Sequence, residues 1–326
     1  MLRVLFLQAK IPMPLPDDTR IEPVARDDWP ALAGFIHRHN RRADGSVRCL
    51  HAAQGDSVTA LANELAVLQA DEAAFWRACD PGGVIEGIVG CEFDAALRRA
   101  WLRGPIVTGD PSQRLALLSR LAQALEEGLP QIRCFDAFPA EDEVPLNALY
   151  AARGYRRLGV HRVLEAALGA AEPIAASTWP CPLGVTIRRA EAADLAPLLA
   201  LHEVLFPNSY LKPSDFAEAV GDPGRHLLVC TDSDARLLGY LHAKDDPEQP
   251  EVYVDYLGVA SEARGQGLGG ALLAGALAWG RALGRPRASL TVREDRAPAR
   301  ALYERGGFRL VSAGVHWRLE PGERPA

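Results

Sequence analysis

The 326-residue sequence is poor in lysine and cysteine, and each shortage excludes a class of protein. Its lysines are Lys10, Lys212 and Lys244, so none follows a glycine-rich turn as the P-loop of nucleoside triphosphatases requires. The six cysteines are scattered with no C-x-x-C pair, which argues against a disulfide framework and favours the cytoplasm. The eight histidines show no metal-ligand spacing, and we expect no metal site.

Long apolar runs and an excess of basic charge are also missing. No run reaches the ~20 apolar residues of a membrane span, and residues 4–7 are too short for a signal sequence. With a formal net charge of −6, the chain lacks the basic surface that binds nucleic acids or anionic membranes, and we expect neither as a partner. Its length favours about two domains, since single hydrophobic cores rarely grow beyond roughly 250 residues.

One stretch near the C-terminus has a strong local pattern. Residues 252–259 are rich in Val and Tyr and predict a strand, whereas residues 271–283 have helical apolar spacing and end at Gly284. The glycine-rich residues 264–270 between them predict a turn that leaves backbone N–H groups free at a helix N-terminus. Glycine suits this turn because it permits unusual φ and ψ angles and lets a phosphate approach the backbone. The stretch therefore predicts a site for a phosphate-bearing ligand.

Two glycine patterns remain for this turn once the P-loop is excluded. The dinucleotide fingerprint G-x-G-x-x-G matches at positions 265, 267 and 270, and an acid follows at residues 294–295. However, hairpin-like strands precede it and too few residues follow to complete a doubly wound sheet. The pattern R/Q-x-x-G-x-G/A is met by Arg264, Gly267 and Gly269.

A second motif in the right order decides between the two patterns. Residues 299–308 read ARALYERGGF, which fits A-x-x-L-Y-x-x-x-G-F. The two motifs together resemble the GNAT superfamily of acyl-CoA-dependent N-acyltransferases. The resemblance implies acetyl-CoA as co-substrate, lying between two splayed parallel strands at 252–259 and 288–292.

The resemblance also implies roles for individual residues. The expected acetyl-CoA contacts are Leu257, Gly258, Val259, Arg264, Gly265, Gln266, Gly267, Leu268, Gly269, Gly270 and Arg296, the last standing where the family often has Asn. Val259 would donate its backbone N–H to the thioester oxygen, and Tyr303 would protonate the departing CoA thiolate. The alternative for Tyr303 is a core aromatic, as we expect for Tyr150 in the first half of the chain.

The general base is less clearly indicated. Asp255 and Tyr253 share a strand face by their period-two spacing, and Asp255 could take the amine proton directly or through water. It could equally be a structural hydrogen-bonding group. His202 and Glu203 are weaker candidates, expected as a surface pair. We expect the acceptor to contact Tyr253 and the loop 206–211, through Phe206, Asn208 and Tyr210.

The chain repeats one order of elements. In the first half we expect strands at 21–24, 73–78, 84–90, 100–107, 131–135, 155–158 and 161–165, and helices at 27–39, 58–68, 112–127 and 146–152. In the second half we expect strands at 185–188, 226–231, 236–243, 252–259 and 288–292, a last hairpin through 308–311 and 316–319, and helices at 195–205, 271–283 and 296–305. Leu149-Tyr150 recurs as Leu302-Tyr303, and Val107 takes the place of Val259.

This repeat predicts two consecutive GNAT-like domains of mixed α/β class, at residues 1–170 and 185–326, with a linker at 171–184. The resemblance implies for each a mixed, mostly antiparallel sheet with helices on both faces and splayed central strands. The first domain has Asp110-Pro111 where the second has its glycines, so we expect it to have lost acyl-CoA. Two such domains form a pseudo-dimer within one chain, which is compatible with a monomer, although the sequence does not decide the oligomeric state.

The sequence thus predicts an acetyl-CoA-dependent N-acetyltransferase, active in its C-terminal domain. The acceptor is an amine of unidentified identity, expected to be a small molecule. Tandem organisation also resembles enzymes that acetylate the amine of a sugar–cysteine thiol. The alternatives are a non-catalytic acyl-CoA-binding sensor or interaction module, and thirdly a dinucleotide-binding oxidoreductase.

Overall fold

The computed structural model describes residues 19–52, 57–169, 179, 182–207, 209–246 and 250–320. The chain forms two compact units, each with its own hydrophobic core. Unit 1 comprises Met1–Val160 and Ala313–Ala326, and unit 2 comprises His161–Ser312.

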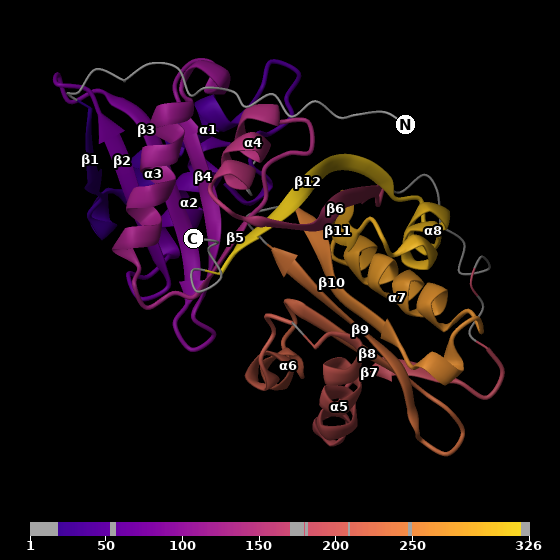
Figure 1. Cartoon of the computed structure of the whole chain (residues 1–326). Coiled ribbons are helices and arrows are strands. Elements are labelled where there is room, and N and C mark those ends of the chain that lie inside the picture. Colours follow the sequence, from indigo (N-terminus) through magenta and orange to yellow (C-terminus); the bar gives the residue numbers. More distant parts are fainter. Residues whose placement is uncertain are drawn as a thin grey trace, which may run out of the picture. The chain divides into compact units, whose positions relative to one another are not determined.

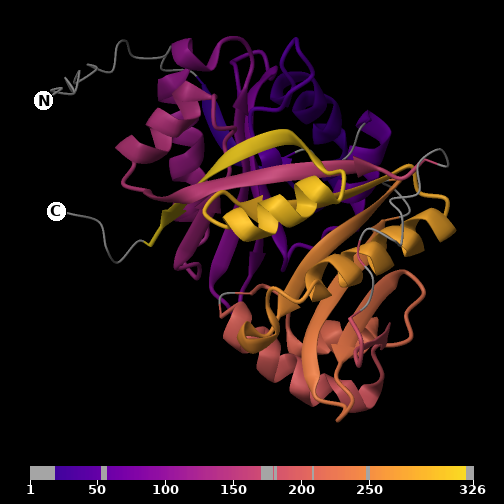
Figure 2. The same ribbon diagram turned by 90° about the vertical axis from the view of Figure 1, so that its right-hand side faces the viewer.

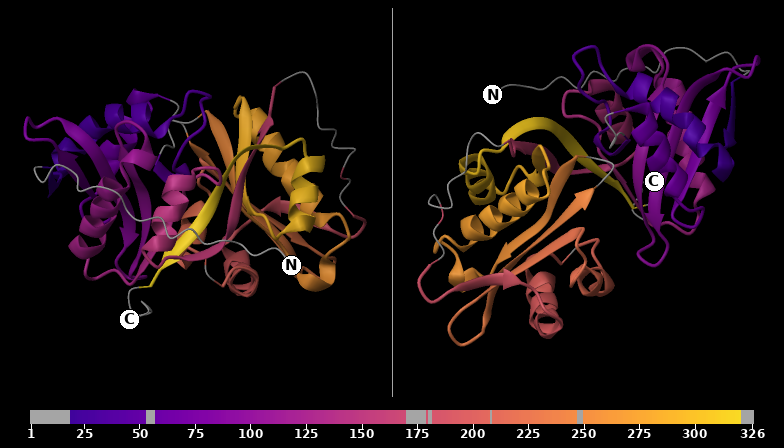
Figure 3. Two further views of the ribbon diagram at one scale, coloured as in Figure 1. Left: turned by 45° about the horizontal axis from the view of Figure 1, so that its top comes forward. Right: turned by 180° about the vertical axis from the view of Figure 1, so that it is seen from behind.

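Unit 1 is built on a mixed sheet. Its strands are β1 (Arg20–Pro23), β2 (Ala73–Cys79), β3 (Ile85–Asp94), β4 (Arg99–Val107) and β5 (Cys134–Ala137), followed by the end of β12 (Arg309–Leu319). Neighbours are antiparallel except β4 and β5, which are parallel. Its helices are η1 (Arg26–Leu32), α1 (Ala33–Asn40), η2 (Leu50–Ala52), α2 (Val58–Val67), η3 (Pro111–Gln113), α3 (Leu115–Gly128) and α4 (Val144–Ala152). Figures 1 and 3 show α3 on one face of this sheet and α1 with α2 on the other.

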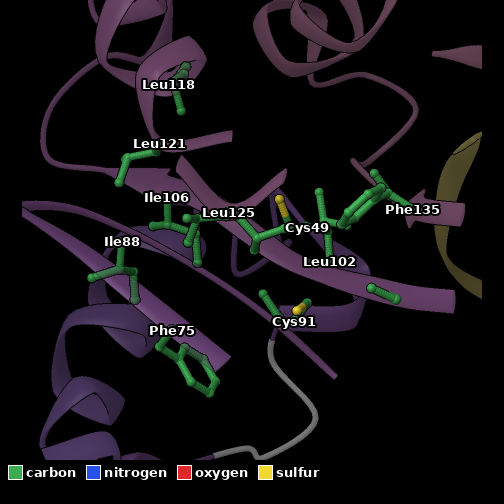
Figure 4. Close-up of a cluster of buried hydrophobic side chains, with 14 of the residues drawn as sticks. Cys49, Phe75, Ile88, Cys91, Leu102, Ile106, Leu118, Leu121, Leu125 and Phe135 are labelled. Atoms are coloured by element: carbon green, nitrogen blue, oxygen red, sulfur yellow. The ribbon is translucent and has the colours of Figure 1, made fainter. Parts of the chain in front are cut away.

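An apolar stripe on α3 covers the sheet of unit 1. Leu118, Leu121 and Leu125 recur at the three- and four-residue spacing of one helix face, and all three are buried. Figure 4 shows Leu121 and Leu125 beside Ile106 of β4. Full burial of such a side chain contributes roughly 1.5–3 kcal/mol, so this stripe explains why α3 is held on the sheet.

Unit 2 repeats the arrangement. Its strands are the end of β6 (Arg156–Ala167) from residue 161 on, β7 (Thr186–Arg189), β8 (Arg225–Thr231), β9 (Leu237–Asp246), β10 (Glu251–Val259) and β11 (Arg287–Arg293). The sheet order is β6-β11-β10-β9-β8-β7, and among these neighbours β10 and β11 are parallel. Its helices are η4 (Ala192–Asp194), α5 (Leu195–Leu205), α6 (Pro213–Ala219), η5 (Ser261–Ala263), α7 (Leu268–Ala282) and α8 (Ala297–Arg305). Figures 1 and 2 show α7 and α5 on opposite faces. The expected mixed, mostly antiparallel sheet with helices on both faces is confirmed.

Three of the expected elements are wrong in detail. The stretches 155–158 and 161–165 form one strand, β6, and the expected hairpin through 308–319 is one strand, β12. Each is long because its end pairs with a strand from the other half of the sequence. Residues 161–167 of β6 lie beside β11, and residues 317–319 of β12 lie beside β5. The helix expected at 27–39 begins as the 3₁₀ helix η1, which contains Pro30 and continues into α1.

Candidate active site

Strands β10 and β11 separate partway along their length. Their parallel pairing covers residues 251–254 of β10 and ends with Val254 opposite Leu290. Beyond that point β10 continues beside β9 to Val259, whereas β11 continues beside β6 to Arg293. Among the described residues, one edge of β10 is therefore open from residue 255 to residue 259.

The open edge presents backbone N–H groups. Ala260 donates its N–H to the carbonyl of Leu238 in β9, at 2.8 Å. Successive N–H groups of an antiparallel strand point to alternate sides, so those of Leu257 and Val259 point away from β9 and into the opening. Two of the residues expected to contact acetyl-CoA thus direct donors to the place where a linear ligand would pair as an added strand.

A left-handed turn follows this edge and begins α7. Gly265 and Gly267 have φ angles of +78° and +84°, and neither has an atom within 4 Å of the position that a Cβ would take. Gly267 is the N-cap of α7, and no side chain caps this end. The first-turn amides, at Leu268, Gly269 and Gly270, are consequently donors without an intrahelical acceptor, and the helix dipole favours an anion there. Arg264 turns back and donates to the Val259 carbonyl, at 3.2 Å.

The last two glycines of the turn have a different reason to be glycine. A Cβ on Gly269 would lie 3.2 Å from Leu302 of α8 and 3.5 Å from Leu257. A Cβ on Gly270 would lie 2.5 Å from the ring of Trp179, which also approaches Gly306 at the end of α8. Gly269 therefore allows α7 to pack closely on β10 and α8, and Gly270 makes room for a tryptophan whose contribution the sequence did not indicate.

Tyr303 on α8 differs from its repeat counterpart Tyr150 on α4. Tyr150 is fully buried and its hydroxyl donates to the Gly104 carbonyl at 2.6 Å, which confirms the expected core role. Tyr303 is 8% exposed and packs on Phe308, and within the described chain its hydroxyl has no hydrogen-bond partner. Burial raises the pKa of Tyr303 to about 12, so the phenol keeps its proton at neutral pH.

A β-bulge sets the other face of β10. Val254 lies opposite Ala243 and Tyr256 lies opposite His242, which leaves Asp255 as the extra residue. Lys244 contacts both the Tyr253 ring and the Asp255 carboxylate, so the expected common face of Tyr253 and Asp255 is confirmed. The bulge adds the neighbouring Tyr256 to this face, where it packs on His202 of α5. Strict alternation would have put Tyr256 on the opposite face.

Asp255 is a buried carboxylate held by hydrogen-bond donors and cations. Its side chain is 3% exposed, with His242 Nδ1 at 3.5 Å and Lys244 Nζ at 3.9 Å from one oxygen. The hydroxyl of Tyr210 donates to the other oxygen. Burial by itself would raise the pKa of this carboxyl, but these three partners hold it below its ordinary value. Asp255 is therefore an anion at neutral pH.

His202 lies in an aromatic cluster and not, as expected, in a surface pair. It is 6% exposed, and its ring lies within 4.8–5.8 Å of the rings of Phe206, Phe216, Tyr240 and Tyr256. Its Nδ1 shares a hydrogen bond with the Tyr240 hydroxyl at 2.5 Å. Burial, together with nearby His242, lowers the pKa of His202, which favours the neutral ring. Glu203 is exposed, as expected.

The remaining expected site residues divide into three groups. Phe206 and Tyr210 lie beside Tyr256, whose hydroxyl accepts from Ser209 at 3.0 Å. Arg296 is largely exposed at the start of α8, 3.9 Å from Asp295. Asn208 lies outside the described residues.

The sequence analysis missed three residues of β9 that lie opposite β10, namely Tyr240, His242 and Lys244. Their spacing of two residues, which places them on one face of the strand, was the signal that could have found them.

Unit 1 lacks one of the two backbone donors at the equivalent edge of β4. Thr108 donates to Glu86 as Ala260 does to Leu238, which places Pro105 at the position of Leu257. Proline has no N–H to offer, and the carbonyl of neighbouring Gly104 is taken by Tyr150. Where the second unit has glycines, Asp110 caps the turn by accepting from the backbone and side chain of Ser112.

The acceptor-side face of unit 1 is also changed. At the same register, Arg103 stands in the place of Asp255 and Glu92 in the place of Lys244. Arg103 is buried and is bonded by Glu64 and Glu92. The signs of the charges are thus reversed between the two units. The Arg103 guanidinium is already paired with the carboxylates of Glu64 and Glu92.

Among the described residues, no group of three or more His, Cys, Asp or Glu side chains is placed to hold a metal ion. No helix in the same residues is long and apolar enough to cross a membrane.

Sequence comparison places this site in a family. Residues 195–308 match the acetyltransferase (GNAT) family. A mycothiol acetyltransferase of Clavibacter michiganensis subsp. michiganensis is 33% identical over 184 residues, which cover 54% of this chain and 59% of that protein. One from Clavibacter sepedonicus is 43% identical over 102 residues, covering 31% and 33%. The matched part thus spans no more than about three-fifths of these two relatives.

Solved structures share the fold of both units. A GCN5-related N-acetyltransferase from Sphaerobacter thermophilus superposes with a TM-score of 0.74 at 19% identity, covering 94% of this chain and 97% of that one. A tandem GNAT protein from the clavulanic acid biosynthesis pathway superposes with a TM-score of 0.65 at 18% identity, covering 94% and 100%. Residues 195–308 therefore form an acetyltransferase domain of the GNAT family, within a chain that has the fold of a tandem GNAT protein.

Proposed function

We propose that unit 2 transfers an acetyl group from acetyl-CoA directly to the primary amine of a small-molecule acceptor, and that unit 1 binds no acyl-CoA. One observation carries the proposal: in the described chain the open N–H edge of β10 is followed, after the short helix η5 and the glycine turn, by the uncapped N-terminus of α7. A ligand that is extended and amide-bearing at one end and anionic at the other fits this sequence of donors. Acetyl-CoA, the co-substrate of the family, has that chemistry.

The backbone does most of the binding in this proposal. The pyrophosphate lies on the amides of residues 265–270, and the pantetheine arm pairs with Leu257 and Val259. The Val259 N–H faces the thioester oxygen, where one such donor is typically worth about 3–4 kcal/mol of transition-state stabilisation. The rest of the rate comes chiefly from holding the amine beside the thioester.

Tyr303 is the proposed acid. The Tyr303→Phe variant is expected to lower kcat about a hundredfold, because the departing thiolate loses its proton donor. Steady-state rates at saturating acetyl-CoA measure this effect. The matched control is Tyr150→Phe, which removes the hydrogen bond to Gly104 and should cost about 1 kcal/mol of stability without changing kcat. Unchanged turnover in Tyr303→Phe would leave this residue a purely structural role.

The acceptor side favours a cationic amine. The Asp255 carboxylate is ionised and lies among the aromatic rings of Tyr253, Tyr256 and Tyr210, a combination that attracts ammonium groups. Because the relatives are named mycothiol acetyltransferases, a sugar–cysteine amine such as cysteinyl-glucosamine is the first acceptor to assay. Spermidine, kanamycin and free amino acids complete the panel.

The test is a calorimetric titration of acetyl-CoA and of NADH into the intact protein, followed by the amine panel. We expect micromolar binding of acetyl-CoA with a stoichiometry near one, no binding of NADH, and turnover of at least one amine. A stoichiometry near two would refute the inactive role given to unit 1. Binding of acetyl-CoA without turnover of any amine would favour a sensor, and binding of NADH alone would favour an oxidoreductase.

A further inference from the structure

We propose that His242, oriented by Asp255, accepts the proton that the acceptor ammonium must lose before it attacks the thioester. The inference rests on the proposed function and names a residue in the same site. Asp255 then acts as a positioning residue, and the proton acceptor is an imidazole on the neighbouring strand.

The bulge in β10 brings the two side chains together. The register of β9 and β10 shifts between Val254 and Tyr256, so that Asp255 and Tyr256 both lie opposite His242. The Asp255 oxygen Oδ2 is 3.5 Å from His242 Nδ1, and both side chains are 3% exposed. This approach is a contact and not a formed hydrogen bond, and in catalytic sites such contacts often shorten into hydrogen bonds when substrate binds.

The other nitrogen of His242 is the one available for chemistry. A neutral imidazole carries one proton, and a carboxylate beside Nδ1 holds the proton there, which leaves Nε2 as an acceptor. Both ring nitrogens of His242 are buried and make no hydrogen bond in the described part of the chain, and Nδ1 is the one that faces the Asp255 carboxylate, at 3.5 Å. An unsatisfied buried acceptor costs free energy, and an ammonium seated on this face would satisfy it.

The surroundings distinguish His242 from the other two candidates. His202 has its Nδ1 committed to Tyr240, an uncharged partner that does not fix the proton as a carboxylate does. Asp255 has both oxygens engaged by His242, Lys244 and Tyr210, and its lowered pKa makes it a weak base. An imidazole whose Nδ1 faces a carboxylate can take a proton at Nε2, as the histidine of a catalytic triad does.

Several titratable or charged groups share this face and must be considered in any pH profile. They are Lys244 and Tyr240 on β9, Asp255, Tyr253 and Tyr256 on β10, Arg225 on β8, His202 on α5 and Tyr210 after α5, while α6 contributes the apolar Phe216.

His242 Nε2 takes one proton from the ammonium, and the nitrogen lone pair then forms the C–N bond to the acetyl carbon. The C–S bond breaks with its electron pair on sulfur, which takes a proton from Tyr303. The nitrogen's second proton replaces the one that Tyr303 gave up, and His242 returns the first to solvent. The products are the amide, free CoA and one proton.

The first test reads the imidazole directly and needs no acceptor. Nitrogen-15 NMR of histidine-labelled protein with acetyl-CoA bound should show His242 with an unprotonated Nε2, the signal being assigned by its loss in His242→Gln. In Asp255→Asn the amide can donate to Nδ1, so the Nε2-protonated tautomer is expected to predominate. An unchanged tautomer in Asp255→Asn would overturn the orienting role.

The second test is kinetic, with the best acceptor of the cysteinyl-glucosamine, spermidine and kanamycin set. His242→Gln should lower kcat at least tenfold at pH 7 without changing the Kd of acetyl-CoA, and its rate should rise about tenfold per pH unit, because only the free amine then reacts. His226→Gln is the control, since that buried histidine stacks on Trp279 on the opposite face of the sheet. A His242→Gln rate within twofold of wild type, with an unchanged pH profile, would overturn the proposal.

The two tests separate this inference from the proposed function. If wild type binds acetyl-CoA but acetylates no amine, the function fails, and the tautomer measurement still decides the Asp255–His242 pair. If wild type is active and His242→Gln remains active, the function stands and the base lies elsewhere.

Discussion

An aspartate in place of Gly267 is expected to raise the Kd of acetyl-CoA about a thousandfold. Gly267 begins α7 with a φ of +84° and has open space where a side chain would lie. A carboxylate there would stand about 4 Å from the pyrophosphate, where two like charges repel by about 4 kcal/mol at an effective dielectric constant of 20. That energy corresponds to about three powers of ten in Kd. Calorimetric titration of acetyl-CoA measures the change.

The same helix supplies a matched control at its other end. Gly284 also has a positive φ, +71°, and nothing within 4 Å of its Cβ position, so Gly284→Asp introduces the same residue with comparable backbone strain. It follows the C-terminus of α7, far from the first-turn amides, and should leave the Kd unchanged. Equal losses in the two variants would attribute the effect to strain, and an unaffected Gly267→Asp would place the phosphate elsewhere.

Replacing Asp136 by alanine is expected to destabilise unit 1 by about 3–5 kcal/mol, the usual result of breaking a buried ion cluster. Asp136 on β5 is fully buried and accepts from His316 at 2.7 Å and Arg318 at 2.8 Å, both on β12, and from Arg99 at 2.5 Å. Its loss would leave buried donors facing one another where β12 joins the sheet. Hydrogen exchange of residues 134–137 and 315–319, with chemical denaturation, measures the effect.

The pH dependence follows from the same contacts. Burial opposes ionisation, but His316 and the two arginines hold the pKa of Asp136 well below its usual range. A group whose pKa is lowered by folding stabilises the protein above its unfolded pKa, roughly 3.9 for Asp, and this contribution is lost as the pH falls toward the folded pKa. The difference in stability between wild type and Asp136→Ala should therefore shrink below pH 4.

Asp142 provides the control for this prediction. Its side chain is 75% exposed and is paired with Arg42 at 2.8 Å, so Asp142→Ala should cost less than about 1 kcal/mol. If Asp136→Ala were equally mild, the buried cluster would not be what holds β12 in unit 1.

The strand, turn and helix at residues 252–270 were predictable because their information is local. Residues 252–270 carry their own strand, turn and helix signals, and Gly265 and Gly267 have the positive φ angles that such a turn needs. The separation of β10 from β11 agrees with the splayed central strands that the resemblance implied. Gly270 is the exception, because its contact with Trp179 joins residues far apart in the chain.

The domain bounds were beyond sequence reasoning. Alternation and turn signals indicate that β6 and β12 are extended, but they do not say which strand each lies beside. Strand pairing is a non-local choice, decided here by residues such as Asp136, which binds two side chains of β12. That is why residues 313–320 belong with the first unit and not with the second.

The sequence by itself indicated the family, through two short motifs, and the conformation of the glycine-rich turn, since each of these depends on residues close together in the chain. The tertiary structure decided which side chains surround Asp255. A single extra residue in β10 turns Asp255 and Tyr256 to one face, where Asp255 lies 3.5 Å from His242 and Tyr256 packs on His202. Because side chains alternate with a period of two, a bulge of one residue reassigns a strand's faces, and only the pairing of β9 with β10 reveals where it lies.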